Sequence, residues 1–301
     1  MAKTLVTRRD RLQAGLSFPR SLMVLAKRKP LGAFGALILL TMIVMAVGAP
    51  VLGTQDPNKM SVSNRFVAPG AHYWFGTDNY GRDVYSRIVY GARVSLYVGF
   101  FSVILGVGLG TAVGITGGYF LGKLDLTIQR IVDILLAFPP LLLALVISTS
   151  VGPSLNTVVV AVAIPLAAHS ARVMRSQAMA IRENTYVEAA RAIGSSDFRI
   201  LLRDIAPNCM PVFIVVATVQ LAHAILVEAS LSFLGGGVPP PHASWGRMLS
   251  SEAMEFTRKA PWLLIFPGVA LSLAVYGFNL LGDAVRDVLD PRERGRGRRK
   301  I

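Results

Sequence analysis

The sequence predicts an all-α, polytopic membrane protein with six transmembrane helices. Hydrophobic residues make up 53% of the 301 residues and charged residues only 16%, a balance too apolar for a soluble domain. Long uncharged runs recur along the chain, and the basic residues behind the net charge of +14 lie in the tails and loops that flank them. Because these basic residues have little aromatic interleaving, they indicate an orientation in the membrane and not a nucleic-acid surface.

Uncharged runs define the spans, since a helix needs roughly 20 residues to cross a bilayer. Run 31–52 holds 22 residues, more than the roughly 7 to 15 apolar residues of a cleaved signal peptide, so we expect an uncleaved first span. Run 134–171 holds 38 residues, too many for one helix, and Gly152-Pro153 predicts a turn that divides it into the third and fourth spans. The remaining predicted spans are 94–122, 205–227 and 261–282.

The distribution of Lys and Arg predicts on which side of the membrane each segment lies. Six spans place both termini on one side, and with a cytoplasmic N-terminus the inner segments carry 23 basic residues and the outer segments 8. The predicted organisation is a basic cytoplasmic tail (1–29), a first transmembrane helix (30–52), a periplasmic segment (53–93), a transmembrane core (94–282) with a cytoplasmic loop (183–211), and a second basic cytoplasmic tail (283–301).

Glycine recurs every fourth residue in the second span, at Gly106, Gly110, Gly114 and Gly118. An α-helix turns once in 3.6 residues, so these positions form a nearly straight groove without side chains. The pattern predicts that a neighbouring helix packs closely there, a structural role.

Prolines in later spans predict kinks or helix ends, because proline removes an intrahelical hydrogen bond. They are Pro139-Pro140 in the third span, Pro165 in the fourth and Pro267 in the sixth. A bundle that opens and closes can use such positions as bending points.

Polar residues within the spans are few. In the fifth span Gln220, His223 and Glu228 fall on one broad helix face, where they either line a translocation path or form hydrogen bonds between helices. At the start of the third span, the position of Asp133 close to Arg130 predicts an interfacial ion pair.

No constellation for catalysis, metal binding or a cofactor is found in the sequence. Residues 117–123 fit the phosphate-binding pattern GxxxxGK, but Leu124 replaces the required Ser/Thr and the preceding segment is a membrane span, so the match is rejected. The four histidines are far apart, and the single Cys209 is interpreted as an inert apolar residue. The chain is therefore not expected to be an enzyme.

The cytoplasmic loop has the features of two short helices. Thr185 and Glu188 fit a capping box for a helix over 186–193, and Gly194 can adopt the left-handed conformation that ends it. A second helix is expected from Ser195 or Ser196 to about residue 204, broken by Pro207 before the fifth span. The small side chains of Ala189 and Ala190 would allow another protein to approach closely.

These residues also resemble a known family. Glu188-Ala189-Ala190, followed by Gly194 and then by Ile205-Ala206-Pro207-Asn208, is similar to the EAA loop of binding-protein-dependent ABC importer permeases. Further motifs resemble the second permease subunit of dipeptide and oligopeptide importers over roughly residues 30–291: FGTD (75–78), GRDV (81–84), SR (86–87), GARVSL (91–96), EASLSFLG (228–235), SWG (244–246) and FNLLGDAVRDVLDP (278–291). Ala206, where the family usually has Leu, and the very basic stretch 292–300 depart from the pattern.

The resemblance implies a type I ABC importer permease fold and a coupling helix seated in a separate ATP-hydrolysing subunit. Glu188 would be bonded there, Ala189 and Ala190 would give clearance, and Gly194 would make the turn. The implied partners are a homologous second permease subunit, two cytoplasmic subunits that bind ATP-Mg, and a periplasmic solute-binding protein, which meets the outer segments 75–93 and 235–260. The implied location is the bacterial inner membrane.

The function expected on this basis is ATP-driven import of di- or oligopeptides by alternating access. Nickel complexes, glutathione, opines and sugars remain open as substrates. The alternative is a proton-coupled peptide transporter, for which only His223 and Glu228 are candidate acid/base residues and no clear internal repeat is seen.

Overall fold

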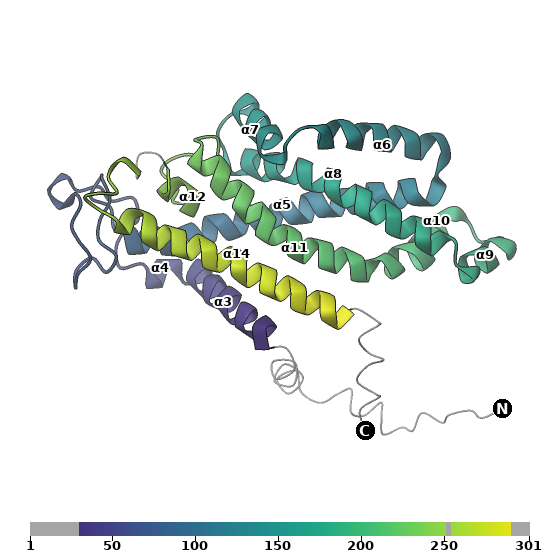
Figure 1. Cartoon of the computed structure of the whole chain (residues 1–301), viewed down its shortest axis with the longest axis horizontal. Coiled ribbons are helices and arrows are strands. Elements are labelled where there is room, and N and C mark those ends of the chain that lie inside the picture. Colours follow the sequence, from purple (N-terminus) through teal and green to yellow (C-terminus); the bar gives the residue numbers. More distant parts are fainter. Residues whose placement is uncertain (1–29, 251–253, 290–301) are drawn as a thin grey trace, which may run out of the picture.

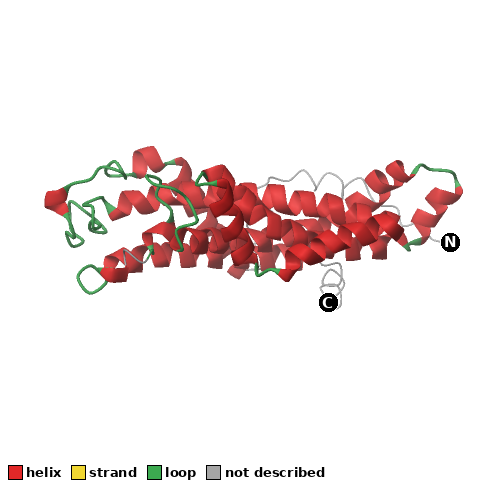
Figure 2. Ribbon diagram, turned by 90° about the horizontal axis from the view of Figure 1, so that it is seen from above, coloured by secondary structure: helices red, strands yellow, loops and turns green. Residues whose placement is uncertain are grey.

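The computed structural model describes residues 30–250 and 254–289. Over these residues the chain forms an elongated bundle of α-helices and contains no β-strand (Figures 1 and 2). Five helices are long and apolar enough to cross a membrane, or six if one bent pair counts as a single span. The predicted all-α, six-span architecture is confirmed for this part of the chain, while the basic stretches 1–29 and 290–301 lie outside the described residues.

The centre of the bundle is formed by helices α5 (Val84–Phe120) and α8 (Leu155–Arg182), which share the most extensive contact in the structure. Each glycine of the four-residue repeat faces the backbone of α8. A Cβ atom added at any of them would lie less than 3.0 Å from a carbonyl oxygen of α8, the four pairs being Gly106 with Ala163, Gly110 with Ala167, Gly114 with Ala171 and Gly118 with Arg175. The predicted close-packing groove is confirmed.

Helix α5 begins at Val84, whereas the uncharged run predicted a start at 94. The side chain of Asp83 caps the first turn, and Arg87 donates a hydrogen bond to the carbonyl oxygen of Pro57, 3.0 Å away. Because the loop before the helix supplies Asp83 as the cap and the carbonyl of Pro57 as a partner for Arg87, the helix extends beyond the apolar run. The first ten residues of α5 therefore come from the predicted periplasmic segment 53–93.

The predicted third span is two helices, α6 (Gly122–Ala137) and α7 (Pro140–Val151), bent by 91° with respect to each other. The break falls at Phe138 and Pro139, where the residue preceding a proline is driven to an extended conformation. The prediction that Pro139-Pro140 marks a kink or helix end is confirmed. The third span predicted from residue 134 therefore consists of the last turn of α6 and the whole of α7, and α7 alone is only about 18 Å long.

Two ion pairs attach α6 to α8. Arg175 holds Asp125 with two hydrogen bonds of 2.6 and 2.5 Å, and Arg172 pairs with Asp133. The predicted ion pair of Asp133 is present, but its partner is Arg172 of α8 and not Arg130, which lies one turn back on α6. The contact between α6 and α8 determines which arginine pairs with Asp133.

Three further helices complete the bundle: α3 (Pro30–Val47), α11 (Ala206–Phe233) and α14 (Trp262–Leu289). Helix α3 lies beside α14 on one side of α5 and α8, and α11 packs between α14 and α5 (Figure 1). The short helix α4 (Ala49–Leu52) follows α3. Pro165 and Pro267 lie inside α8 and α14 without ending them, and α14 continues past the predicted boundary at 282.

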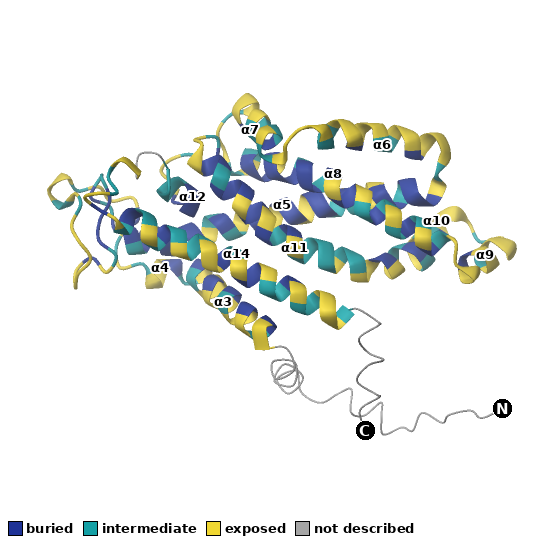
Figure 3. Cartoon of the chain, in the orientation of Figure 1, coloured by how far each residue is buried: buried dark blue, intermediate teal, exposed yellow. Residues whose placement is uncertain are grey.

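Burial follows these contacts. Buried residues line the faces where α5, α8 and α11 meet, whereas α6 is mostly exposed (Figure 3). Large apolar side chains remain exposed along the outer faces of the long helices, among them Leu37, Phe100 and Ile104. A lipid bilayer or an apolar partner would cover such surfaces.

The glycine groove predicts the effect of a single methyl group. Gly110→Ala should destabilise the chain by about 1 to 3 kcal/mol, because the backbone of α8 cannot move away from the added Cβ. Thermal unfolding of the detergent-purified chain measures this change.

Gly108 provides the matched control, since a Cβ added there meets nothing within 4 Å. Gly108→Ala should leave stability unchanged or raise it by up to about 1 kcal/mol. Equal effects of the two substitutions would show that the groove is not closely packed.

Candidate functional site

Between α8 and α11 the chain leaves the bundle and forms two short helices, α9 (Thr185–Ala192) and α10 (Asp197–Ile200). They project from one extremity of the elongated molecule (Figures 1 and 2), which we call the α9 end. Residues 183–200 are named the tip segment. Its arrangement depends on how its helices start, how they end and how they are attached.

Helix α9 starts at Thr185, with Asn184 as its N-cap and no side-chain capping hydrogen bond. The carbonyl oxygen of Asn184 already accepts hydrogen bonds from the amides of Val187 and Glu188, at 2.9 and 3.3 Å. The predicted capping box was therefore wrong, because the helix begins at Thr185 itself, the residue that was expected to cap it. Glu188 is exposed in the first turn, where a negative charge suits the helix dipole.

Gly194 ends α9 as predicted. Its φ of +79° lies in the left-handed region, its amide bonds to the carbonyl of Arg191 at 2.9 Å, and the amide of Ser195 bonds to that of Ala190 at 3.0 Å. These two bonds form a Schellman motif, which closes the helix and reverses the chain.

Helix α10 continues into α11 through one π-helical turn, Leu201–Ile205. The amide of Ala206 bonds to the carbonyl of Leu201, five residues back, and Pro207 follows in the first turn of α11. Residues 197–233 thus form one continuous helical run, and the predicted break at Pro207 was wrong. A wider turn before a proline accommodates the missing N–H group without ending the helix.

Apolar side chains anchor the tip segment to the bundle. Val187, Ile200 and Ile205 are fully buried and belong to one cluster with Met174 of α8. Ala190 packs against this cluster, and Cys209, with its side chain buried, is part of it. Val187 was not predicted as a site residue, although its spacing of three residues from Ala190 marks a buried helix face.

A polar contact adds a second attachment. The hydroxyl of Tyr119, near the end of α5, donates a 2.6 Å hydrogen bond to the carboxylate of Asp197 at the start of α10. The guanidinium of Arg191 lies over the Tyr119 ring, 5.3 Å from its centroid. Tyr119 therefore connects the central helix to both tip helices, and no local motif indicated it.

The opposite side of the tip segment is open. Ile193 is 82% exposed and Phe198 71% exposed, while Tyr186 and Ala189 are also exposed. We call these four residues the tip face. Large apolar side chains that are this exposed, on a segment that projects from the bundle, are typical of a contact with another protein.

The structure separates the three polar residues predicted to share a face of the fifth span. Gln220 and Glu228 are buried, whereas His223 is exposed. Glu228 accepts hydrogen bonds from Ser95 of α5 at 3.1 Å and from Ser232 at 2.8 Å, the interhelical role that was the alternative interpretation. Only His223 keeps the exposure that a path-lining residue needs.

No group of three or more His, Cys, Asp or Glu side chains that could hold a metal ion gathers within residues 30–250 and 254–289. The residues of the rejected GxxxxGK match lie in the last turn of α5 and the first of α6, in helical structure with no strand before them.

The fold defines a multi-pass membrane protein with a pair of short helices that projects from one end. Residues 106–295 match the family of the binding-protein-dependent transport system inner membrane component. The chain belongs to this family, which confirms the ABC importer permease predicted from the EAA-like loop.

Similar proteins cover nearly the same length. A putative peptide transport system permease protein of Brucella suis is 44% identical over 258 residues, 86% of each chain. A dipeptide transport system permease protein of Alkalihalophilus pseudofirmus is 43% identical over 266 residues, 88% of this chain and 87% of that one. A glutathione transport system permease protein of Escherichia coli is 40% identical over 270 residues, 89% of each.

Among solved structures, the inward-facing MetNI methionine ABC transporter covers 67% of this chain and 94% of its own, with a TM-score of 0.47 and 20% identity. A likeness of this size adds nothing to the family assignment.

The Tyr119 contact predicts that Tyr119→Phe loosens the tip segment. Loss of a hydrogen bond to a carboxylate costs about 1.5 to 3 kcal/mol, so amide exchange over residues 197–200 should become at least about tenfold faster. Hydrogen exchange followed by mass spectrometry measures this rate.

Tyr97→Phe is the control, because Tyr97 lies on the same helix and donates to exposed Asn156 at the other end. It should leave exchange at the tip segment unchanged. Unaltered exchange in Tyr119→Phe would remove Tyr119 from the attachment of the tip.

Proposed function

We propose that this chain is a permease subunit of an ATP-driven importer of short peptides, and that its tip segment receives the driving force. The observation that carries the proposal is a helix pair that exposes Ile193 and Phe198 on one side and is fixed to the bundle by Val187 and Tyr119 on the other. A contact made on the tip face is thereby connected to α5 and α8.

Energy must come from a partner, because the chain has no nucleotide-binding motif of its own. Moving a carrier from 1:99 to 99:1 between two states takes about 5.5 kcal/mol of differential binding. We propose two cytoplasmic ATP-binding subunits as its source, one seated against Glu188 and the tip face. Gly194 then sets the turn, while Ile205 and Pro207 join the tip to α11.

Ala189 and Ala190 lie on different sides of α9. Ala189 is exposed and gives clearance to a partner, whereas Ala190 packs on the anchoring cluster. A larger residue at 190 would act first on the attachment of the tip.

Short peptides are the proposed cargo because the similar permeases are named for peptide, dipeptide and glutathione transport, and all of these carry peptide-type substrates. The other proposed partners are a homologous second permease subunit and a periplasmic binding protein. The orientation that fits the 23 inner and 8 outer basic residues puts the α9 end in the cytoplasm.

Gly194→Pro should reduce ATP-driven peptide uptake by more than about tenfold while the chain still inserts in the membrane. Proline cannot adopt the φ of +79°, and it loses the N–H group that bonds Arg191. Uptake into proteoliposomes holding all subunits measures the loss.

Gly152→Pro is the matched control in the turn between α7 and α8, since Gly152 has a φ of +103° and its amide bonds to the carbonyl of Ser148. It should keep uptake within about twofold of the parent. Normal uptake by Gly194→Pro would refute the coupling role, and uptake that follows the proton gradient in the absence of ATP would refute the proposed energy source.

A further inference from the structure

A cavity of about 380 Å³ lies at the extremity opposite the α9 end. Its wall combines the loop before α5, the first turns of α5, the end of α11, helix α12 (Trp245–Met248) and the start of α14. This volume is in the range of small-molecule sites, roughly 300 to 1,000 Å³. Much of the lining is apolar, including Met60, Phe233, Pro240, Met248 and Leu263.

Three arginines line this cavity, Arg82, Arg87 and Arg247, and Asp78 is the single acidic residue among the described lining residues. The described lining therefore carries a formal net charge of +2. Arg87 experiences the positive charges of both other arginines. Like charges gathered in a partly dehydrated space repel one another, and a bound anion relieves that repulsion.

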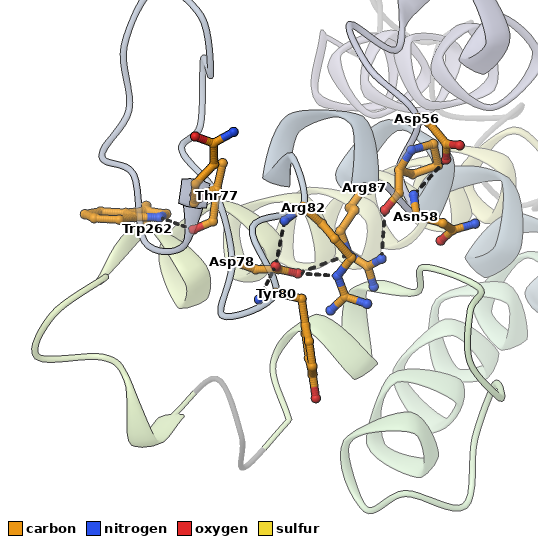
Figure 4. A network of polar contacts seen from close by, with 10 residues as sticks. Asp56, Asn58, Thr77, Asp78, Tyr80, Arg82, Arg87 and Trp262 are labelled. Carbon is orange, nitrogen blue, oxygen red and sulfur yellow. Dashed lines mark hydrogen bonds and ion pairs between the residues drawn. The ribbon is translucent and has the colours of Figure 1, made fainter. Parts of the chain in front are cut away.

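Asp78 is largely occupied by its own loop (Figure 4). Its carboxylate accepts hydrogen bonds from the amides of Tyr80 and Arg82, at 2.8 and 2.9 Å, and from Nε of Arg82 at 2.7 Å. Nε of Arg87 forms a longer ion pair with it, at 3.8 Å. One carboxylate thus orders the loop and pairs closely with one arginine of the three.

The remaining two arginines are held by backbone carbonyls. Arg87 donates to Pro57 at 3.0 Å, and Arg247 donates to Val238 at 3.3 Å. The Arg87 side chain is only 4% exposed, so it is fixed in place and recessed. A guanidinium has five N–H donors, and one bond to a carbonyl leaves donors in a planar fork.

We propose that this cavity binds the carboxylate of a small molecule through Arg87 and Arg247. Arginine forks match the two oxygens of a carboxylate, and the apolar wall accommodates the rest of the molecule. Because the Arg87 side chain is recessed, a small ligand can reach it more readily than a flat protein surface can. The identification of the ligand as the C-terminal carboxylate of a short peptide rests on the proposed function. The existence of a carboxylate-binding site does not.

The test is direct binding to the permease complex in lipid nanodiscs, without binding protein and without ATP. Saturation-transfer NMR compares Ala-Ala, Ala-Ala amide, glutarate and inorganic phosphate. Ala-Ala should bind at least about tenfold more tightly than its amide, because the amide lacks the charge that the arginines pair with. Arg247→Gln should lower the affinity for Ala-Ala by at least about tenfold.

Two further variants are controls. Arg258→Gln removes an exposed positive charge that does not line the cavity and should leave binding unchanged. Glu252→Gln removes an acidic residue two positions beyond the lining residue Ser250, in a part of the chain outside the described residues. It should also leave binding unchanged, and a tenfold gain would overturn the proposal by showing that the chain fills its own cavity.

Equal binding of acid and amide, equal binding of phosphate, or unchanged binding in Arg247→Gln would each overturn the carboxylate site. Arg247-dependent binding of glutarate without binding of Ala-Ala would support the site and contradict a peptide as its ligand. Peptide uptake by the complete transporter is measured separately, so uptake without binding at Arg247 refutes the site while the proposed function stands.

Discussion

Close packing of α5 against α8 is the constraint on which the rest of the structure depends. The four glycines of the repeat in α5 let the two backbones touch, so the helices cannot slide or separate without losing the whole contact. Helix α5 has 37 residues and is therefore about 55 Å long. It carries Tyr119 at one end and Arg87 at the other, so a single rigid element connects the tip segment to the arginine-lined cavity.

The tip segment suits a part that transmits force. Its buried side, centred on Val187, Ile200 and Ile205, gives an apolar anchor, and the Tyr119 hydrogen bond adds a directional one. Its open side presents the apolar side chains of Ile193 and Phe198. Covering them with a partner is favourable, because it removes apolar surface from water. A partner that moves the tip therefore moves the ends of α5, α8 and α11 together. Helices α6 and α7 are bent by 91° with respect to each other and so stand apart from the straight central helices.

Local patterns in the sequence predicted the structure correctly where one residue type has one physical consequence. Glycine spacing predicted the α5 groove, Gly194 predicted a left-handed helix end, and Pro139-Pro140 predicted the break. Features that depend on distant contacts were missed or mistaken. The start of α5 at Val84 depends on a loop that satisfies its charges, and the partner of Asp133 is on another helix.

The most direct test of the account is cross-linking from the tip face to the ATP-binding subunit. Ala189→Cys in a Cys209→Ala background gives one reactive thiol on the exposed side of α9, and Val51→Cys, 88% exposed near the opposite extremity, is its counterpart. A short thiol-reactive cross-linker should join residue 189 to the ATP-binding subunit in the assembled transporter, with a yield that changes when ATP binds. Residue 51 should give no such product. Absence of a product from residue 189, with the complex intact, would contradict the account.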